Sequence, residues 1–226
     1  MTTAPRVILA SGSPQRSEIL RKLGVEFEIV VPGVEELTGG DPEFEVVENA
    51  RRKTRAIVDA SRAGGAVGGP TPEDALATAG GGGSPAATGP ARQAHGPARV
   101  VLACDTDVVL DGKALGKPAD ERDAREYLDR MSGRAHVVMS GLVVLVGGEE
   151  RSGLEKTTVV FKELSDAEKE RYVRFGEWRG RSGGYAIQTL GSTLVERIEG
   201  SVSNVVGLPI GLLADLTPEL LSDRSP

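Results

Sequence analysis

The stretch VVLACDTD at residues 100–107 begins with a dense apolar run rich in β-branched residues, which predicts a buried strand. Two acids, Asp105 and Asp107, follow this run. Side chains two positions apart in a strand point to the same face, so we expect Asp105 and Asp107 on one face and Thr106 on the other. A carboxylate is costly there unless it binds a cation or accepts hydrogen bonds. The stretch fits a metal-dependent active site, and it also fits a strand that ends in a polar turn.

Composition indicates an acidic globular chain. Its 226 residues are 39% hydrophobic and 27% charged, which suits one large domain or two small lobes around a core. The net charge of −6 argues against a nucleic acid polymer as partner, so phosphate chemistry would require a local basic pocket. The single cysteine, Cys104, excludes an internal disulfide and fits a reducing compartment. We expect it to be a small buried residue, because no histidine is near it in the sequence.

Membrane and export signals are absent from the sequence pattern. No apolar run approaches the ~20 residues that a membrane helix needs. Residues 1–6 contain no basic segment followed by an apolar core, so no signal peptide is evident. We therefore expect a cytoplasmic protein with no membrane partner.

Hydrophobic periodicity predicts interleaved strands and helices. Strands are expected at 7–10, 27–31, 100–110, 137–146, 155–164 and 193–198, with a turn at Gly147-Gly148. Helices are expected at 14–23, where Ser13 is a candidate N-cap, and at 43–63, 119–131, 166–175 and 209–216. Because helices alternate with strands but adjacent strand pairs also occur, we predict an α/β fold with a mixed twisted sheet flanked by helices.

Residues 64–98 differ in composition from the rest of the chain. Of these 35 residues, 24 are Gly, Ala or Pro, and none is aromatic. Such a segment buries too little apolar surface to offset its ordering entropy. We interpret it as a flexible insertion within a single domain spanning 1–226, with a lid or a partner-binding tail as the alternative.

The loop from Ser11 to Arg16 joins an expected strand to an expected helix. A helix N-terminus offers free backbone N–H groups and a partial positive charge, which suits a phosphate. Ser11 and Ser13 add hydroxyl groups, and Arg16 adds a planar guanidinium. The loop lacks the lysine of a P-loop, and a capped helix with a surface arginine is the alternative interpretation.

Further charged residues lie near the expected site. Lys117 is held in a turn between Gly116 and Pro118, just after the acidic strand. Lys53 lies on the long helix in a basic run, and spacing alone does not say which member of the run faces a cleft. The other members of that run are Arg51, Arg52 and Arg55.

Seven pieces of the sequence, in order, resemble the Maf proteins, nucleoside triphosphate pyrophosphatases of the Maf/Ham1-like superfamily. The pieces are ILASGSPQR (8–16), VEFEIVVPGVEE (25–36), ARRKTRA (50–56), ACDTDVVLDGKALGKP (103–118), YLDRMSGRAH (127–136), GGYAIQTLG (183–191) and GSVSNVVGLP (200–209). They cover nearly the whole chain except 64–98. The resemblance implies two lobes around a nucleotide-binding cleft, and it suggests a homodimer.

The resemblance also implies roles for individual residues. Asp105 matches the family's catalytic acceptor, which takes a proton from the water that attacks the α-phosphorus. Arg16, Lys53 and Lys117 match its phosphate-contacting cations. Glu36 and Asp105 match its ligands for a divalent cation, Mg²⁺ or Mn²⁺.

In the resemblance, three positions indicate which nucleotide base the enzyme accepts. Thr106 and Gln188 match the branch that acts on dTTP and UTP. A third position of that set, just before Arg16, is normally Arg and is Gln15 here. Asp107 also departs from the family, which usually has an apolar residue there. It is either a supplementary metal or water ligand beside Asp105 or a carboxylate that faces solvent or accepts hydrogen bonds.

These residues lead to one main hypothesis and two alternatives. The main hypothesis is metal-dependent hydrolysis of a nucleoside triphosphate to a monophosphate and pyrophosphate, in nucleotide-pool house-cleaning. The first alternative is a nucleotide-binding regulator of cell division or septum formation with little turnover. The second is hydrolysis of purine analogues, as in the related Ham1 branch, although the GGYAIQ segment with Gln188 favours the Maf branch.

Overall fold

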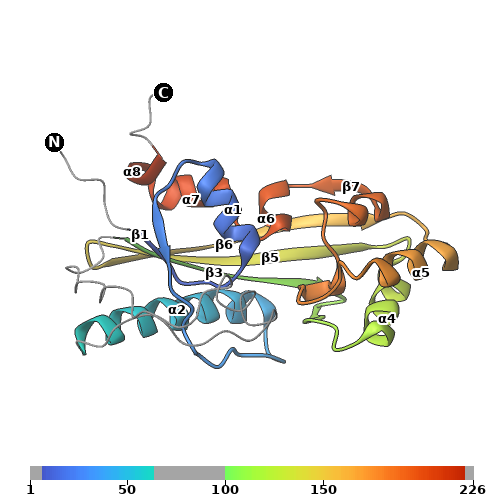
Figure 1. The fold of residues 1–226 in the computed structure, drawn as a ribbon, viewed down its shortest axis with the longest axis horizontal. Helices are drawn as coiled ribbons and strands as arrows, with labels where there is room; N and C mark the ends of the chain where they lie inside the picture. The colour runs from blue at the N-terminus through green and yellow to red at the C-terminus, as the bar shows by residue number, and fades with distance from the viewer. Residues whose placement is uncertain (1–6, 64–99, 222–226) are drawn as a thin grey trace, which may run out of the picture.

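The computed structural model describes residues 7–63 and 100–221 (Figure 1). The predicted insertion at 64–98 lies outside the described residues. The strands are β1 (Val7–Leu9), β2 (Phe27–Ile29), β3 (Val100–Leu110), β4 (Lys113–Ala114), β5 (Ala135–Val146), β6 (Glu149–Phe161) and β7 (Val195–Glu199). The helices are α1 (Pro14–Lys22), α2 (Pro42–Arg62), α4 (Glu121–Met131), α5 (Asp166–Phe175), α6 (Val202–Val206), α7 (Ile210–Leu216) and α8 (Pro218–Leu221). Two short 3-10 helices are η1 (Ser182–Gly184) and η2 (Leu190–Leu194).

The described strands form one mixed sheet, which confirms the predicted α/β fold. Its order is β2-β1-β3-β5-β6-β7, with β4 also paired to β3. β1 runs parallel to β2 and β3, whereas β3, β5, β6 and β7 pair antiparallel. The long strands β3, β5 and β6 extend through both halves of the molecule (Figure 1).

One half of the molecule has three layers, with α1 and α7 on one face of the sheet and α2 on the other (Figure 1). Successive side chains of β3 point to opposite faces of the sheet, so the strand contributes to the core on both sides. Leu102 and Cys104 pack in the cluster that contains residues of α1 and α7. Val101 and Ala103 pack in the cluster that contains residues of α2. Cys104 is a free, fully buried thiol, as expected.

The same alternation orients the acidic residues that follow. Asp105 bonds to side chains of α2, whereas Thr106 bonds to Arg16 of α1 on the opposite face. β3 pairs with β5 residue by residue through this stretch, so Asp107 lies on the same face of the strand as Asp105. The expected division of faces is therefore confirmed.

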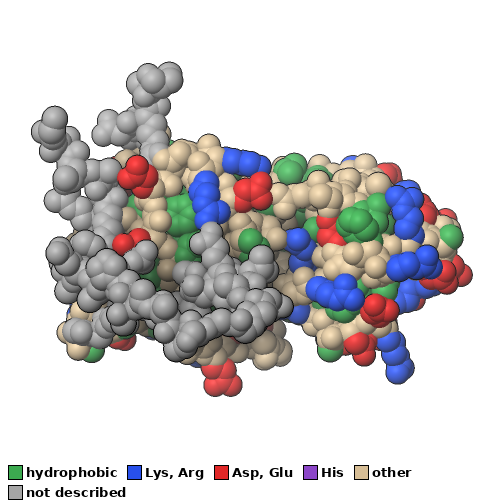
Figure 2. All heavy atoms as spheres, viewed as in Figure 1, with side chains coloured by type: hydrophobic (Ala, Val, Ile, Leu, Met, Phe, Trp, Pro, Cys, Tyr) green, Lys and Arg blue, Asp and Glu red, His purple; other side chains and the backbone are tan. Residues whose placement is uncertain are grey.

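The other half packs α4 and α5 around a second apolar cluster, which includes Leu128, Phe161, Trp178 and Tyr185. α5 begins with a capping box, in which Ser165 and Glu168 satisfy each other's backbone N–H groups. Figure 2 shows acidic and basic side chains interspersed on this half, and ion pairs such as Lys169 with Asp129 join α4 to α5.

β3 spans Val100–Leu110, the range predicted from the sequence, so the two acids lie inside the strand and not in a polar turn at its end. It continues to Leu110, because β5 pairs with it throughout, with Gly141 opposite Asp105. On its other edge, β1 pairs only as far as Leu102, and β4 begins to pair at Val109. The acids therefore lie beside a gap between two neighbouring strands, in the middle of β3.

β6 begins six residues before its predicted start. Glu149, rather than residue 155, begins the strand, directly after the predicted turn. Gly147 and Gly148 have φ of 57° and 98°, which allows a two-residue hairpin turn. Such a turn sets the register of the two strands. The polar residues that follow it therefore pair with β5, although their sequence lacks the apolar alternation typical of a strand.

Candidate active site

A cleft of about 620 Å³ lies at the gap beside β3. Its walls come from the loop before α1, the loop before α2, α2 itself, β3, and the segments around η1 and α6. The sequence-predicted site residues all line it: Ser11, Ser13, Gln15, Arg16, Glu36, Lys53, Asp105, Thr106, Lys117 and Gln188. Asp107 lines it as well.

Asp105 is held by two side chains of α2. Lys53 Nζ lies 2.7 Å from Asp105 Oδ1, and Asn49 Nδ2 donates to Asp105 Oδ2 at 3.0 Å. Lys53 also reaches Glu36 Oε1 at 2.6 Å, so its ammonium group bridges the two carboxylates. Lys53 is buried, so this ion pair is screened less by solvent than a surface pair would be.

Lys53 is the member of the basic run that contacts Asp105. Arg51 pairs with Glu48 and with Glu150 of β6. Arg52 donates to Glu35 O at 3.2 Å, and both Arg52 and Arg55 lie near Glu48. The contacts of these three arginines therefore lie away from Asp105.

Asn49 is a site residue that the sequence reasoning missed. It is 4% exposed, and its amide makes three hydrogen bonds. Oδ1 accepts from Leu37 N at 2.7 Å, and Nδ2 donates to Leu37 O at 3.1 Å as well as to Asp105. Asn49 thereby ties Asp105 to the residue that follows Glu36. Its signal was available, because it lies one helical turn before Lys53 on the same face of α2.

Arg16 forms the opposite wall. Its guanidinium donates to Gly207 O at 2.8 Å, Ser11 Oγ at 2.9 Å and Thr106 Oγ1 at 3.0 Å. All three acceptors are neutral, and no carboxylate within the described residues pairs with Arg16. Ser13 is the N-cap of α1 without a side-chain cap bond, so the first turn of α1 is left with free N–H groups.

The two predicted base-choice residues differ in their surroundings. The hydroxyl of Thr106 contacts Arg16 and lies 2.8 Å from Ser140 Oγ. Gln188 is exposed at the cleft wall, with its amide available to a ligand.

Asp107 faces a different partner from Asp105. Its Oδ1 accepts hydrogen bonds from Ser182 Oγ and from Val108 N. Burial raises the pKa of the Asp107 carboxyl above its usual value; the bonds from Ser182 and Val108 oppose this, and the charge of Asp105 adds to it. These contacts match the interpretation of Asp107 as a hydrogen-bonded carboxylate.

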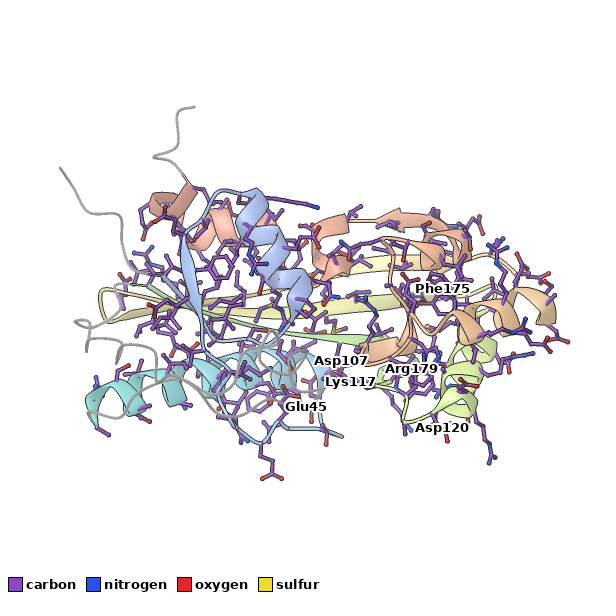
Figure 3. All side chains as sticks on the ribbon, in the orientation of Figure 1. Glu45, Asp107, Lys117, Asp120, Phe175 and Arg179 are labelled. Carbon is purple, nitrogen blue, oxygen red and sulfur yellow. The ribbon has the colours of Figure 1, made fainter. Side chains whose placement is uncertain are left out.

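Lys117 is exposed at the cleft and forms no ion pair with a described residue. Figure 3 places Lys117 and Asp107 in the middle of the molecule, between α2 and the half that carries α4. The ammonium group of Lys117 can therefore contact a negatively charged ligand in the cleft.

The donor set fits a divalent cation. Glu36 and Asp105 already share one cationic group, the ammonium of Lys53, so their oxygens converge on a common point. Magnesium is often bound by one or two carboxylates, with waters and substrate phosphates completing its shell. Within the described ranges, no group of three or more His, Cys, Asp or Glu side chains is placed to hold a metal. Asp107 therefore does not complete a three-carboxylate site.

The chain is similar to known proteins over nearly its whole length. None of the helices in the described part of the chain is long and apolar enough to cross a membrane. A dTTP/UTP pyrophosphatase from Deinococcus radiodurans is 39% identical over 215 residues, covering 95% of this chain and 92% of the relative. Proteins of the same name from Anaeromyxobacter dehalogenans and Symbiobacterium thermophilum are 37% and 36% identical, covering 94% and 91% of this chain and 93% and 89% of the relatives. A family model described as Maf-like protein matches residues 6–220, and the chain therefore belongs to the Maf family.

Proposed function

We propose that this protein hydrolyses nucleoside triphosphates to nucleoside monophosphate and pyrophosphate. The observation that carries the proposal is the arrangement of Asp105, held by Lys53 and Asn49, across one cleft from Arg16. The names of the relatives support the same reaction and point to dTTP and UTP as substrates.

The reaction breaks the bond between the α-phosphorus and the oxygen that bridges it to the β-phosphorus. Asp105 accepts a proton from the attacking water, and the pyrophosphate leaves with the bridging oxygen. Lys53 and Asn49 hold the carboxylate in one orientation, which keeps the base aimed at the water. Arg16 and Lys117 stabilise the negative charge that develops on the leaving group.

Glu36 and Asp105 would hold the divalent cation, Mg²⁺ or Mn²⁺. When bound, the cation neutralises phosphate charge and fixes the geometry of the chain of phosphates. Lys53 already contacts both carboxylates, so it keeps them together whether or not the cation is bound.

The choice of a pyrimidine base would rest on Gln188, whose exposed amide can donate to and accept from a base edge. Thr106 would act indirectly, by orienting Arg16. We also propose that the protein is cytoplasmic and forms a homodimer. No observation on the described residues favours a regulator with little turnover.

Pyrophosphate release from a panel of standard and modified triphosphates, with Mg²⁺ or Mn²⁺, tests the proposal. The variant Asp105→Asn should lower kcat by about 10²- to 10⁴-fold, because the base is lost while the shape is kept. Asp59→Asn is the matched control, because Asp59 is an exposed acid on α2 away from the cleft, and it should leave kcat unchanged. Absence of release from every triphosphate, or full activity in Asp105→Asn, would overturn the proposal.

A further inference from the structure

Arg181 lies in the cleft and has no role in the chemistry described above. Arg181 directly precedes η1, on the half of the molecule opposite to α2. Its Nε donates to Glu177 O at 2.8 Å, which anchors the guanidinium at one end. Its Nη groups point across the cleft to α1.

The contact across the cleft is made with Gln15. In the amide orientation that gives both groups a partner, Gln15 Oε1 accepts from Arg181 Nη1 at 2.9 Å and Nη2 at 3.1 Å. The Gln15 amide nitrogen donates to Ser13 Oγ at 3.0 Å. Arg181 is thereby placed at the first turn of α1, beside the loop that carries Ser11 and Arg16.

That position is electrostatically unfavourable without a ligand. A helix N-terminus carries partial positive charge, and the first turn of α1 contains no acidic residue to offset it. Both acceptors of Arg181 are neutral, and no carboxylate in the described ranges forms an ion pair with it. Arg16 is likewise bound only by neutral oxygens, so no carboxylate of the described residues neutralises either guanidinium group.

The loop that carries Arg181 is fixed at its next residue. Ser182 donates from its hydroxyl to Asp107, and it also accepts a hydrogen bond from Val108 N at 3.0 Å. Gly183 N donates to Gly116 O at 2.8 Å. Asp107 therefore connects β3 to the segment that delivers Arg181. A guanidinium held this firmly loses little conformational freedom when it binds an anion.

We propose that Arg181 is an additional phosphate-binding residue, which contacts the pyrophosphate portion of the substrate from the wall opposite Lys53. Gln15 is its positioning residue. Five N–H donors are available on a guanidinium, and three are used, which leaves two for phosphate oxygens. The inference rests on the proposed function for the identity of the substrate, but the binding it describes does not require turnover.

The test compares Arg181→Gln and Arg181→Lys with Arg179→Gln. Arg179 is the matched control, because it lies two residues away and pairs with Glu121 outside the cleft. The affinities of inorganic pyrophosphate and of a nucleoside monophosphate are measured by calorimetry, together with KM and kcat for the best triphosphate.

Arg181→Gln should weaken pyrophosphate binding by about 10- to 100-fold, which is the usual effect of losing a hydrogen bond to a charged group. It should raise KM by a similar factor and leave monophosphate binding unchanged. Arg181→Lys should restore part of the affinity, and Arg179→Gln should change none of these values. Gln15→Leu should raise KM more than it lowers kcat, and the double variant Gln15→Leu/Arg181→Gln should be no worse than Arg181→Gln alone.

Pyrophosphate affinity that is unchanged in Arg181→Gln, or equally weakened in Arg179→Gln, would overturn the inference. A change of base preference with unchanged pyrophosphate affinity would also overturn it, because Arg181 would then read the base. If the wild-type protein binds pyrophosphate but hydrolyses no triphosphate, the proposed function fails, while the calorimetric comparison still decides the role of Arg181.

Discussion

A few buried polar side chains hold the site together. Asn49 connects three backbone or side-chain partners, and Lys53 joins the carboxylates of Glu36 and Asp105. Each of these two α2 residues is less than one-tenth exposed. At such depth an unmatched polar group is costly, so removing one partner affects every residue tied to it.

Asn49→Ala tests this dependence. Without the amide, Leu37 loses two backbone hydrogen bonds and Asp105 loses one orienting donor. We expect kcat to fall by about 10-fold and stability to fall by about 1–3 kcal/mol. Thr54→Val is the control, because Thr54 is a buried polar residue on the same helix whose hydroxyl bonds only to Ala50 O. If both variants lose kcat equally, Asn49 has no specific influence on Asp105.

His136 gives a prediction for pH. It is buried against Phe161 and Tyr185, and burial lowers its pKa from 6.5 to about 4. Between these values the unfolded chain binds a proton that the folded chain does not, so stability rises with pH across that window. The contribution is ~3 kcal/mol, and it is present above pH 6.5 and lost as the pH falls toward 4.

Denaturant unfolding of His136→Gln at several pH values checks this. The variant removes the titrating group, and its amide can still reach the Tyr185 hydroxyl that His136 Nε2 contacts at 2.8 Å. Its free energy of unfolding should change less than that of the wild type between pH 6.5 and 4. An identical pH slope in both proteins would contradict the assignment.

At the scale of elements, the position of α2 depends on one glycine in β5. A Cβ on Gly141 would lie 2.3 Å from the backbone C and O of Val46. Gly141 pairs with Asp105 across the two strands. The helix therefore crosses the sheet closely at the level of Asp105, and Asn49 and Lys53 on its following turns contact the Asp105 carboxylate directly.

Gly141→Ala should therefore lower both stability and activity. The contacted atoms are backbone, so α2 must move away from the sheet, and the 2.7 Å contact between Lys53 and Asp105 lengthens. Overpacking of this kind usually costs about 1–3 kcal/mol. Gly211→Ala, where a Cβ meets nothing within 4 Å on α7, should leave activity unchanged and stabilise the helix slightly. Thermal unfolding and pyrophosphate release compare the two variants, and wild-type activity in Gly141→Ala would contradict this role.

At the scale of the whole molecule, charge is distributed unevenly. The chain carries a net charge of −6, yet its cleft brings Arg16, Lys117 and Arg181 together from both halves of the structure. None of these three forms an ion pair with a described residue. An anion in the cleft would therefore connect the two halves, which are otherwise joined mainly by the long strands of the sheet.

Inorganic pyrophosphate should consequently stabilise the folded protein. At a hundredfold excess over its dissociation constant, a ligand that binds only the folded state adds about 2.7 kcal/mol to the free energy of unfolding. Denaturant unfolding with and without pyrophosphate, each in the presence and absence of Mg²⁺, measures the effect. Sodium chloride at matched ionic strength is the control, and equal stabilisation by both salts would mean that the cleft has no specific anion site.

Local sequence patterns were sufficient for much of the fold. Alternation in VVLACDTD predicted a buried strand with Asp105 and Asp107 on one face, and hydrophobic period predicted α2 and α5 nearly to their ends. These features depend on neighbours within a few residues, which a pattern contains.

Only the tertiary structure shows that Lys53, and not its basic neighbours, contacts Asp105. Periodicity predicts which side of a helix faces the sheet, but it does not predict which turn of the helix lies against which residue of a strand. Here the close approach of α2 to Gly141 fixes that position, and Gly141 is far from Lys53 in the sequence. The contact between Gln15 and Arg181 is equally nonlocal, because it forms only after two halves of the chain fold around the shared strands.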